Sequence, residues 1–570
     1  MSQSRIRNIL KTLTFLASVG FLTSMSSAAG LARFDWVDYR NAEAGPPPAA
    51  GQYRNPILGG YYPDPSVVRV GDDFYLVNST FSWFPGIPVW HSRDLVHWRQ
   101  IGNAIHRPDQ LDFSGLGMSR GVFAPYISYH KGRFYIVNTC VGCGGNFVVT
   151  ATDPKGPWSK PVWLKNVDGI DPSLFFDDDG SAWLVHNAPP QGKSRYNGHM
   201  AIWLTRFDPK TLQAVGEARV IIDAGVDPSK NPIWIEGPHL FKKDGTYYLM
   251  AAEGGTSEGH SEVIFRSDRR DGPFVPAPPS VNPILTQRDL DPARPNPITS
   301  SGHADLVKTA KGDWWAVFLA TRPYEGGLYY NTGRETFLLP VNWADGWPTI
   351  LPHATPIPVI AKAPNLPADT APPTTGSFTA HYDFKSAGLG PNWMMMRTPK
   401  TRWWRIDKGA LVLPARPERL GDGKQPSFVA LRQQSAEAEV TTMVRFEPAE
   451  GEEAGLAALQ NDDDFLSVAV TRSGGKRILR VSRRAGATDP AEGLTVATHD
   501  APAGPIRLRI HARGGLYDFD YASANGRWMP VAHDVDGHNL STYKAGGFVG
   551  TLIGPYAQTS KGAAPLRPHP

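Results

Sequence analysis

The sequence predicts an all-β protein, a five-bladed β-propeller followed by a C-terminal, jelly-roll-like β-sandwich. The chain of 570 residues contains 57 Gly and 52 Pro with an aromatic fraction of 11%, a composition typical of many short strands joined by tight turns. Strand–turn–strand segments of one plan recur five times before about residue 350. Alternating strands that lack this plan fill the rest of the chain, which favours a second β domain.

The five recurring segments share a polar or special first residue, a strand, a Gly-containing turn and an aromatic strand. Their sequences are PDPSVVRVGDDFYLV, FAPYISYHKGRFYIV, IDPSLFFDDDGSAWLV, EGPHLFKKDGTYYLM and GHADLVKTAKGDWWAVF. The turn glycines, about 50 to 70 residues apart, leave room for four strands per unit; they are Gly71, Gly132, Gly180, Gly245 and Gly312. Five four-stranded units of this kind form a five-bladed propeller.

The first strand of each blade lines the propeller axis, so its opening residue is predicted to face the mouth of the central cavity. The five opening residues are Asp64, Ala124, Asp171, Glu236 and His303. A single Asp beside Pro is ordinary turn chemistry. Three carboxylates at one axis repel one another, however, and such a cost is typical of a functional site.

Converging carboxylates suit the hydrolysis of a glycosidic bond, in which one acid protonates the leaving oxygen and another activates water. Glu236 has the longer side chain and is the candidate proton donor. Asp64, held between Pro63 and Pro65, is the candidate base that positions the water. Asp171 is then expected to orient the acid and to raise its pKa by repulsion.

Five ordered motifs between about residues 54 and 350 resemble family 43 of the glycoside hydrolases, most closely its two-domain β-xylosidase and α-L-arabinofuranosidase branch. The motifs are NPILGGYYPDPSVVRVGDDFYLVNSTFSWFPGIPVWHSRDLVHW, GIDPSLFFDDDG, EGPHLFKKDGTYYLMAAEGGT, GHADLV and GRETFLLPVNWADGWP. The resemblance implies a five-bladed propeller and an inverting mechanism. It also implies that Asp64 is the general base, Asp171 the pKa modulator and Glu236 the general acid.

The resemblance extends to substrate-binding residues. Arg334 matches a ligand of the hydroxyls of the released sugar, and Phe81 matches an aromatic wall of its pocket. His303 matches a histidine near the axis that is associated with calcium through water, although the hydrolysis itself requires no cofactor. The chain departs from the branch at Phe123, where Trp is usual, and in a short segment from Arg322 to Arg334. Both departures bear on which pentose binds.

The remaining sequence predicts the domain organisation. Residues 1–29 are typical of a signal peptide, with three basic residues ahead of an apolar run and small residues near Ala29. The expected segments after it are an N-terminal extension (30–53), the catalytic propeller (54–355), a Pro-rich linker (356–378), the β-sandwich (379–557) and a tail (558–570). A sandwich loop closes the pocket in relatives, and Gln460 to Phe465 is a candidate for it, although a solvated hairpin tip is the simpler interpretation.

The charge and the cysteines bound the partners and the compartment. Removal of residues 1–29 lowers the formal charge from +4 to +1, because this segment holds three basic residues and no acid. A nearly neutral protein is not expected to bind nucleic acid or, once the signal is removed, a membrane. We expect an exported protein, periplasmic or extracellular. Cys140 and Cys143 form either a short-loop disulfide or two thiols in a tight turn, with a structural role.

The leading hypothesis is an exo-acting, inverting glycoside hydrolase that releases a terminal pentose, with β-D-xylose favoured, from plant hemicellulose oligosaccharides. Its partners would be xylo-oligosaccharides or arabinoxylan fragments. An α-L-arabinofuranosidase is the alternative, because the acids are common to both activities. An endo-arabinanase needs an open groove, which the added sandwich argues against. A non-catalytic carbohydrate-binding propeller would have no need of a paired acid and base.

Overall fold

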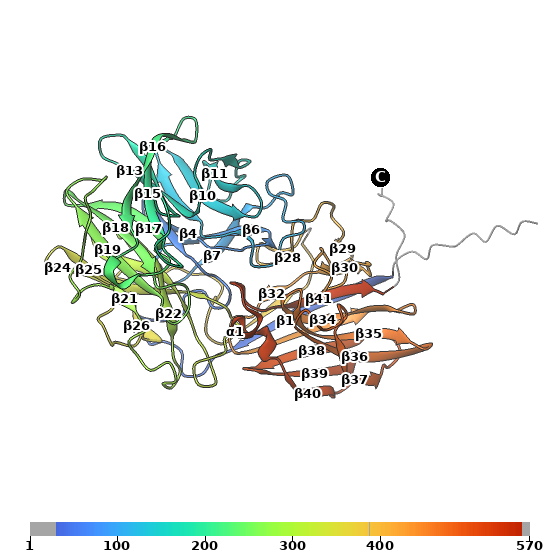
Figure 1. Ribbon diagram of the computed structural model, residues 1–570. Helices are drawn as coiled ribbons and strands as arrows, with labels where there is room; N and C mark the ends of the chain where they lie inside the picture. The colour runs from blue at the N-terminus through green and yellow to red at the C-terminus, as the bar shows by residue number, and fades with distance from the viewer. Residues whose placement is uncertain (1–29, 387, 561–570) are drawn as a thin grey trace, which may run out of the picture.

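The computed structural model describes residues 30–386 and 388–560, which form two β domains lying side by side (Figure 1). The predicted signal peptide and most of the predicted tail lie outside these residues. Within the described ranges, the α-helix α1 (Thr542–Ala545) is a single turn. No helix in these ranges is long and apolar enough to cross a membrane.

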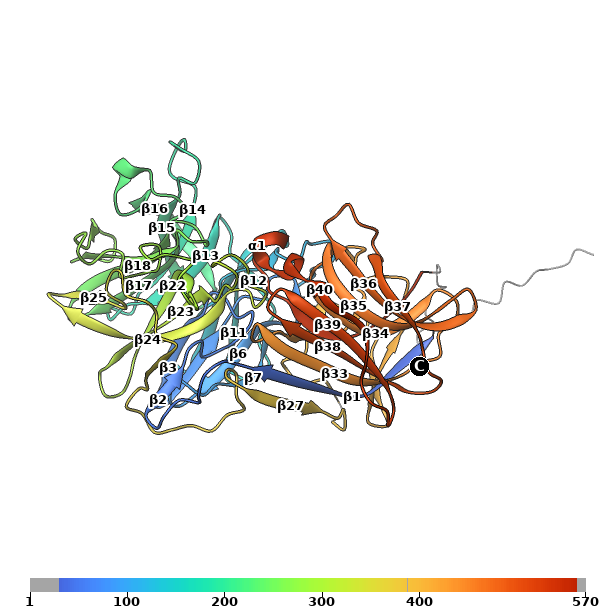
Figure 2. The same cartoon turned by 90° about the horizontal axis from the view of Figure 1, so that it is seen from below.

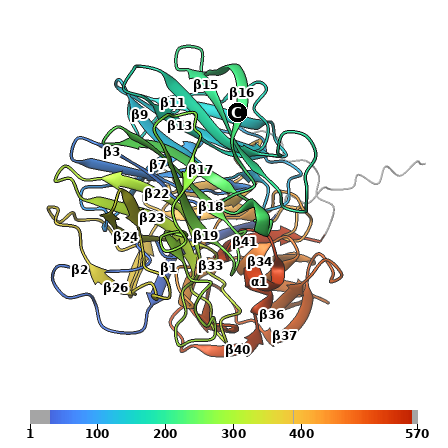
Figure 3. The same cartoon turned by 60° about the vertical axis from the view of Figure 1, so that its left-hand side comes forward.

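The N-terminal domain is the predicted five-bladed propeller, with antiparallel blades that follow one another in chain order (Figures 1 and 3). Blade one contains β3 (Ser66–Val70), β4 (Asp73–Val77), β6 (Gly86–Ser92) and β7 (Arg99–Ile105). Blade two contains β9 (Tyr126–His130), β10 (Arg133–Val141), β11 (Gly145–Ala151) and β12 (Val162–Trp163), and blade three contains β13 (Ile170–Phe176), β14 (Ala182–Ala188), β15 (Ala201–Asp208) and β16 (Gln213–Asp223). Blade four contains β17 (Glu236–Lys243), β18 (Thr246–Glu253), β19 (Ser261–Ser267) and β20 (Val275–Pro276), and blade five contains β22 (Thr299–Lys308), β23 (Trp314–Thr321), β24 (Glu335–Ala344) and β25 (Trp347–Thr349). Two short strands, β8 (Gly121–Val122) and β21 (Leu285–Thr286), extend blades two and four.

The five turn glycines lie where the sequence predicts them, between the first and second strand of each blade. Each has a positive φ, between 64° and 97°, a conformation that glycine adopts without the steric cost that a Cβ adds. All five inner strands therefore open on one face of the propeller and turn back on the other.

Hydrogen bonds between neighbouring blades hold the ring of blades together. The carboxylate of Asp305 in blade five accepts from Ser66 Oγ in blade one at 2.8 Å. Ser66 Oγ in turn accepts from the backbone N–H of Ile127 in blade two at 3.1 Å. Glu262 in blade four accepts from the N–H of Ala304 in blade five at 2.9 Å. These buried bonds fix neighbouring blades relative to the axis, and so fix the residues at the mouth.

The C-terminal domain is a sandwich of two antiparallel sheets, as predicted. One sheet has the order β29-β30-β1-β33-β38-β39-β40, with β27 also paired to β1, and the other has the order β31-β41-β34-β35-β36-β37, with β32 also paired to β41. The strands of the first sheet are β1 (Leu31–Ala42), β27 (Phe378–Tyr382), β29 (Arg405–Asp407), β30 (Ala410–Pro414), β33 (Glu437–Arg445), β38 (Ile506–Arg513), β39 (Leu516–Ser523) and β40 (Met529–Asp536). Those of the second are β31 (Ser427–Phe428), β32 (Leu431–Arg432), β34 (Glu452–Asn461), β35 (Asp464–Ser473), β36 (Lys476–Ala485), β37 (Leu494–Asp500) and β41 (Leu552–Thr559).

The N-terminal extension supplies an inner strand of this sandwich. Strand β1 lies between β30 and β33, far in the sequence from both. Figure 2 shows it beside β33. Its side chains Phe34, Val37 and Tyr39 are buried in the sandwich core. The C-terminal strand β41 continues to Thr559, two residues beyond the expected end of the sandwich at residue 557. The sandwich is therefore built from both ends of the described chain.

One short ladder and one charged cluster join the two domains. Strand β28 (Met395–Met396) pairs with β5 (Trp83–Phe84) of the propeller. A second ladder, of β2 (Gln52–Arg54) with β26 (Ile360–Lys362), holds the predicted linker against the propeller. The guanidinium of Arg322 in the propeller binds the carboxylates of Glu335 and Glu43 and the backbone carbonyl of Gln434 in the sandwich. The relative position of the domains is thus set by paired backbone and buried charge.

The cysteine pair forms a disulfide between Cys140 and Cys143, in the turn that joins β10 to β11. Of the two alternatives, the structure has the disulfide and not two free thiols. The bond closes a hairpin in blade two, in keeping with a structural role.

Candidate active site

Three carboxylates from three blades lie together at the mouth of the propeller. They are Asp64 of blade one, Asp171 at the start of β13 and Glu236 at the start of β17. An oxygen of Asp171 accepts the N–H of Gly237 at 3.0 Å, which places it beside the backbone of Glu236. Burial and the charges of Glu236 and Asp64 raise the pKa of Asp171 well above its ordinary value. The convergence expected from the sequence is present in the structure.

Both carboxylate oxygens of Asp64 are held in place. Oδ1 accepts from Arg334 Nη1 at 2.9 Å, and Oδ2 accepts from Ser79 Oγ at 2.5 Å. The ring nitrogen Nδ1 of His303 lies 3.8 Å from Oδ1. Because burial lowers the pKa of His303 to about 3, this ring is neutral at ordinary pH. Arg334 is therefore the cation that offsets the charge of Asp64.

Glu236 is electrostatically different from Asp64. Burial and, after it, repulsion by Asp64 raise the pKa of Glu236 to about 7, against an opposing effect of Arg334. No side-chain hydrogen bond to its carboxyl group occurs among the described residues, so its proton is not committed to a protein acceptor. A carboxyl group that keeps a proton near neutral pH, close to a fixed carboxylate, is the pairing that acid–base catalysis needs.

The backbone at the mouth is arranged to present these side chains. Asp64, Phe81, Asp171 and His303 all have left-handed φ values, between 49° and 54°, a conformation that costs free energy in residues other than glycine and is concentrated at functional sites. The register of the inner strands shifts next to the opening residues of blades three, four and five. Such bulges turn a side chain out of the regular alternation of a strand.

Glycine is required beside the acid. Gly237 has a φ of +55°, and a Cβ added there would lie 2.8 Å from His303 Nε2. A larger residue would push the histidine from the axis or displace Glu236. The Glu–Gly pair in the sequence is explained by this close approach.

An aromatic wall stands beside the acids. The ring of Phe81 stacks on Phe548 at a centroid distance of 5.6 Å and meets Phe123 edge to face at 5.0 Å. The Arg334 guanidinium lies 5.9 Å from the ring of Phe81 and 5.5 Å from that of Phe548. The structure thus brings four substrate-binding residues of the sequence prediction (Phe81, Phe123, His303 and Arg334) into one site with the three acids.

Phe548 comes from the sandwich and was not predicted. It follows α1, and its N–H donates to Ser119 Oγ of the propeller at 2.9 Å. Gly547 has a φ of +74° and packs so closely on Ser119 that a Cβ would overlap it. The signal in the sequence is an aromatic residue directly after the pair Gly546–Gly547, in a loop between strands.

The candidate loop from Gln460 to Phe465 lies at the same domain junction but makes a different contribution. Asn461, Asp462 and Asp463 line a groove of about 400 Å³ together with Phe548. Asp462 is already paired with Arg397, at 2.6 Å. The loop therefore shapes the junction, whereas Phe548 forms the contact with the aromatic wall.

Two hydroxyl groups complete the polar contacts and were also missed. Ser79 holds Asp64, and Thr256 Oγ1 accepts from Arg334 Nη1 at 3.0 Å. Both lie inside motifs that carry the family resemblance, NST and EGGT. The sequence does not predict these roles, because a Ser or Thr hydroxyl near a turn usually hydrogen-bonds to the backbone.

The residues near His303 do not fit a directly bound calcium ion. Calcium takes six to eight oxygen ligands, and the acid whose charge acts on His303 is Asp64, which is already committed to Arg334 and Ser79. In the described part of the chain, no group of three or more His, Cys, Asp or Glu is placed to hold a metal ion. The water-mediated calcium stays a prediction.

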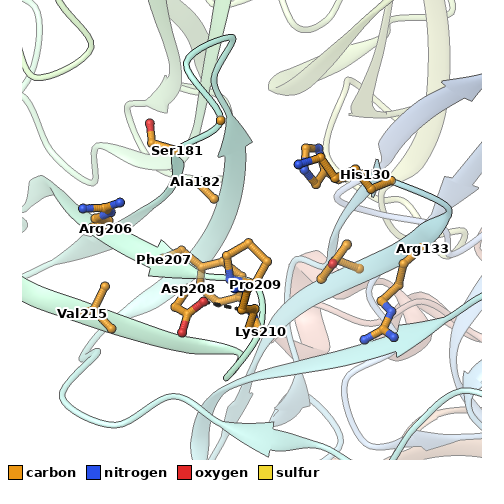
Figure 4. Close-up of a pocket in the computed structure, with 13 residues that line it drawn as sticks. His130, Arg133, Ser181, Ala182, Arg206, Phe207, Asp208, Pro209, Lys210 and Val215 are labelled. Atoms are coloured by element: carbon orange, nitrogen blue, oxygen red, sulfur yellow. Dashed lines mark hydrogen bonds between the residues drawn. The ribbon is translucent and has the colours of Figure 1, made fainter.

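A larger pocket, of about 880 Å³, lies away from the acids (Figure 4). It is formed by hairpin ends of blades two and three, and its charged lining includes Arg133, Arg206 and Lys210. Gly180, also in the lining, is a turn glycine at the far end of β13 from Asp171. At about 3.3 Å per residue, the length of that strand separates the pocket from the acids by about 15 to 20 Å.

Comparison with known proteins gives one consistent result. Residues 53–348 match the family model described as glycosyl hydrolases family 43, and residues 381–565 match that of the beta xylosidase C-terminal concanavalin A-like domain. A xylosidase/arabinosidase of Butyrivibrio fibrisolvens is 38% identical over 89% of this chain and 96% of its own. A non-reducing end alpha-L-arabinofuranosidase of Bacteroides ovatus is 37% identical over 89% and 91%. The crystal structure of a GH43_12 protein from a capybara gut metagenome superposes with a TM-score of 0.86 at 38% identity, covering 93% of this chain and all of that one.

The raised pKa of Glu236 predicts a dependence of stability on pH. The folded state keeps this proton up to about pH 7, whereas the unfolded chain releases it near 4.5, so the stability due to this group is lost as pH rises through that window. Glu236→Gln cannot ionise and should gain about 1 to 3 kcal/mol over the wild type between pH 5 and pH 8. Melting temperatures of the wild type and of Glu236→Gln at pH 5 and pH 8 measure this gain. The control is Glu217→Gln, at an exposed position. A difference that does not change with pH would contradict the shifted pKa.

Proposed function

The chain belongs to glycosyl hydrolase family 43, and we propose that it is an exo-acting, inverting hydrolase that releases a terminal pentose from hemicellulose oligosaccharides. The observation that carries the proposal is the pairing of Glu236, protonated near neutral pH, with the fixed carboxylate of Asp64 across the propeller mouth. Two carboxyl groups in these two states are what glycosidic hydrolysis requires.

The proposed reaction assigns one role to each acid. Glu236 gives its proton to the glycosidic oxygen as the bond from that oxygen to the anomeric carbon breaks. Asp64 accepts a proton from a water molecule, whose oxygen forms the new bond to the anomeric carbon from the opposite face. Asp171 is held by the N–H of Gly237 beside the acid, and its proposed role is to orient Glu236. Burial and the charge of Glu236 raise the pKa of Asp171, whereas the pKa of Glu236 is raised by burial and by Asp64. Arg334 binds the sugar and holds Asp64.

The aromatic wall supports exo action. Phe548 arrives from the second domain and packs on Phe81 and Phe123, so the sandwich closes the site on the side of blades one and two. A site walled in this way accommodates the end of a chain and not its middle. An endo-acting enzyme and a pure binding module are both less well supported, the latter because it needs no paired acid and base.

The released pentose is proposed to be β-D-xylose, with α-L-arabinofuranose as the second candidate. Relatives carry names of both kinds, a xylosidase/arabinosidase and an arabinofuranosidase. The acids are common to both reactions, so the choice depends on the rings around the sugar, Phe81, Phe123 and Phe548. Phe123 stands where the branch usually has the larger Trp.

Export to the periplasm or the cell exterior is proposed with this function. The disulfide between Cys140 and Cys143 supports it, because disulfides persist in oxidising compartments. Oligosaccharides from plant hemicellulose are the proposed partners.

The proposal is tested by hydrolysis of p-nitrophenyl β-D-xylopyranoside, p-nitrophenyl α-L-arabinofuranoside and xylobiose. Asp64→Ala should lose activity on all three. Glu236→Gln should lose at least about a hundredfold on xylobiose but much less on the nitrophenyl glycosides, because nitrophenolate leaves without protonation. If Glu236→Gln loses the same factor on both kinds of substrate, Glu236 is not the acid. A folded wild type that cleaves none of them would overturn the enzyme assignment.

The sandwich contact gives a further prediction. Phe548→Ala removes two ring contacts from the sugar pocket and should lower kcat/KM by about tenfold on the preferred nitrophenyl pentoside. Tyr543→Ala, an exposed aromatic on neighbouring α1, is the matched control and should keep wild-type kinetics. Equal kinetics of the two variants would mean that the sandwich does not form part of the pocket.

A further inference from the structure

An exposed tryptophan stands beside the acid without a role in the reaction described so far. Trp234 lies two residues before Glu236, in the segment that leads from blade three into β17, and 41% of it is exposed. Its neighbour Ile233 is also exposed, at 39%. Large apolar side chains are costly to leave in water, and a pair of them at the rim of a catalytic site is typical of a ligand contact.

The indole is seated between two loops at the mouth of the propeller. The backbone N–H of Trp234 donates to the carbonyl of Gly198 at 2.8 Å. A Cβ on Gly255 would lie 3.3 Å from the indole Cδ1, and one on Gly198 would lie 2.9 Å from Ile233 and 3.5 Å from the indole Cε2. Gly198 precedes β15 and Gly255 follows β18, so both belong to the face on which the inner strands open. The glycines make room for the ring at this face.

The same loop connects the tryptophan to the site. Thr256, next to Gly255, accepts from Arg334 Nη1, which also binds Asp64. On the other side, the carbonyl of Ile235 accepts from Asn187 Nδ2 at 2.5 Å in the protein interior. Trp234 is therefore anchored through its backbone and its neighbours, while much of its ring is left uncovered.

The backbone of Trp234 is strained in the way of the site residues. Its φ of +54° is left-handed, an uncommon conformation for a bulky aromatic residue and one that must be maintained by the surrounding structure. Asp64, Phe81, Asp171 and His303 share this conformation within five degrees.

The reaction places the leaving group next to this ring. The acid must reach the glycosidic oxygen, so the sugar that departs lies on the side of Glu236, away from the wall that Phe81 and Phe548 form beside Asp64. Trp234 is the large exposed aromatic side chain closest in sequence to Glu236. A planar ring offers a stacking surface to the apolar face of a sugar without requiring a particular hydroxyl pattern.

We propose that Trp234 is the stacking platform for the first sugar of the leaving group, and thus a binding residue for oligosaccharides longer than one unit. The inference rests on the proposed function. It implies that the enzyme distinguishes an oligosaccharide from a simple alkyl glycoside through this ring, while the acids and the pocket for the released sugar act on both.

The test compares xylotriose with methyl β-D-xylopyranoside, whose leaving group has no ring to stack. Trp234→Ala should lower kcat/KM for xylotriose by about tenfold, mostly through KM, and change that for the methyl glycoside by less than about twofold. Trp234→Phe should recover most of the loss. If the enzyme prefers arabinose, an arabinosylated xylotriose replaces xylotriose, and methyl α-L-arabinofuranoside replaces methyl β-D-xylopyranoside.

Trp163→Ala is the matched control, since Trp163 is 38% exposed on β12 in blade two, and it should match the wild type on both substrates. Equal losses of Trp234→Ala on both substrates would mean that the residue only positions Glu236, and no loss on xylotriose would remove it from binding; either result overturns the platform. Inactivity of the wild type on every pentoside would instead contradict the proposed function.

Discussion

The mutual repulsion of three partly or fully buried carboxyl groups is the constraint on which this structure depends. Isolated buried charges cost several kcal/mol each, and here the cost is reduced by one cation and by protonation. Arg334 neutralises Asp64, and the N–H of Gly237 stabilises Asp171. Among the described residues, no side chain hydrogen-bonds to the carboxyl group of Glu236, and burial together with the charge of Asp64 raises its pKa. These groups are held together by the hydrogen bonds between blades, the bulges and the left-handed residues at the mouth. On a flexible scaffold, the repulsion would drive the carboxyl groups apart.

The second domain is part of the site and not an appendage. Phe548 reaches the aromatic wall only because Gly547 lets the sandwich loop approach Ser119. The domains are held at this distance by the Arg322 cluster and by the pairing of β28 with β5. Strand β1 adds a covalent constraint, since the described part of the chain begins in the sandwich and then enters the propeller (Figure 2). Displacement of the sandwich would open the pocket on one side.

Structural features that repeat along the chain could be predicted from the sequence, and features that depend on contacts between remote segments could not. Five segments of one plan identify the propeller and place Asp64, Asp171 and Glu236 at one mouth, because equivalent positions of a repeat occupy equivalent places. Phe548 has no such periodic signal, and its contact spans more than four hundred residues. The same holds for β1, whose alternation indicates a strand but not the sheet that it joins. Of the sequence predictions, the candidate loop from Gln460 to Phe465 comes closest to identifying the domain contact, because it lines a groove together with Phe548.

Attack by water from the side of Asp64, while Glu236 protonates the leaving oxygen on the other side, inverts the anomeric configuration. Proton NMR of the first sugar released, recorded before mutarotation, measures that configuration. On a β-D-xyloside, we expect α-D-xylose to appear first and the β anomer to grow in later. If the β anomer appears first, one of the carboxylates is a nucleophile, and the assignment of Asp64 as the base is wrong.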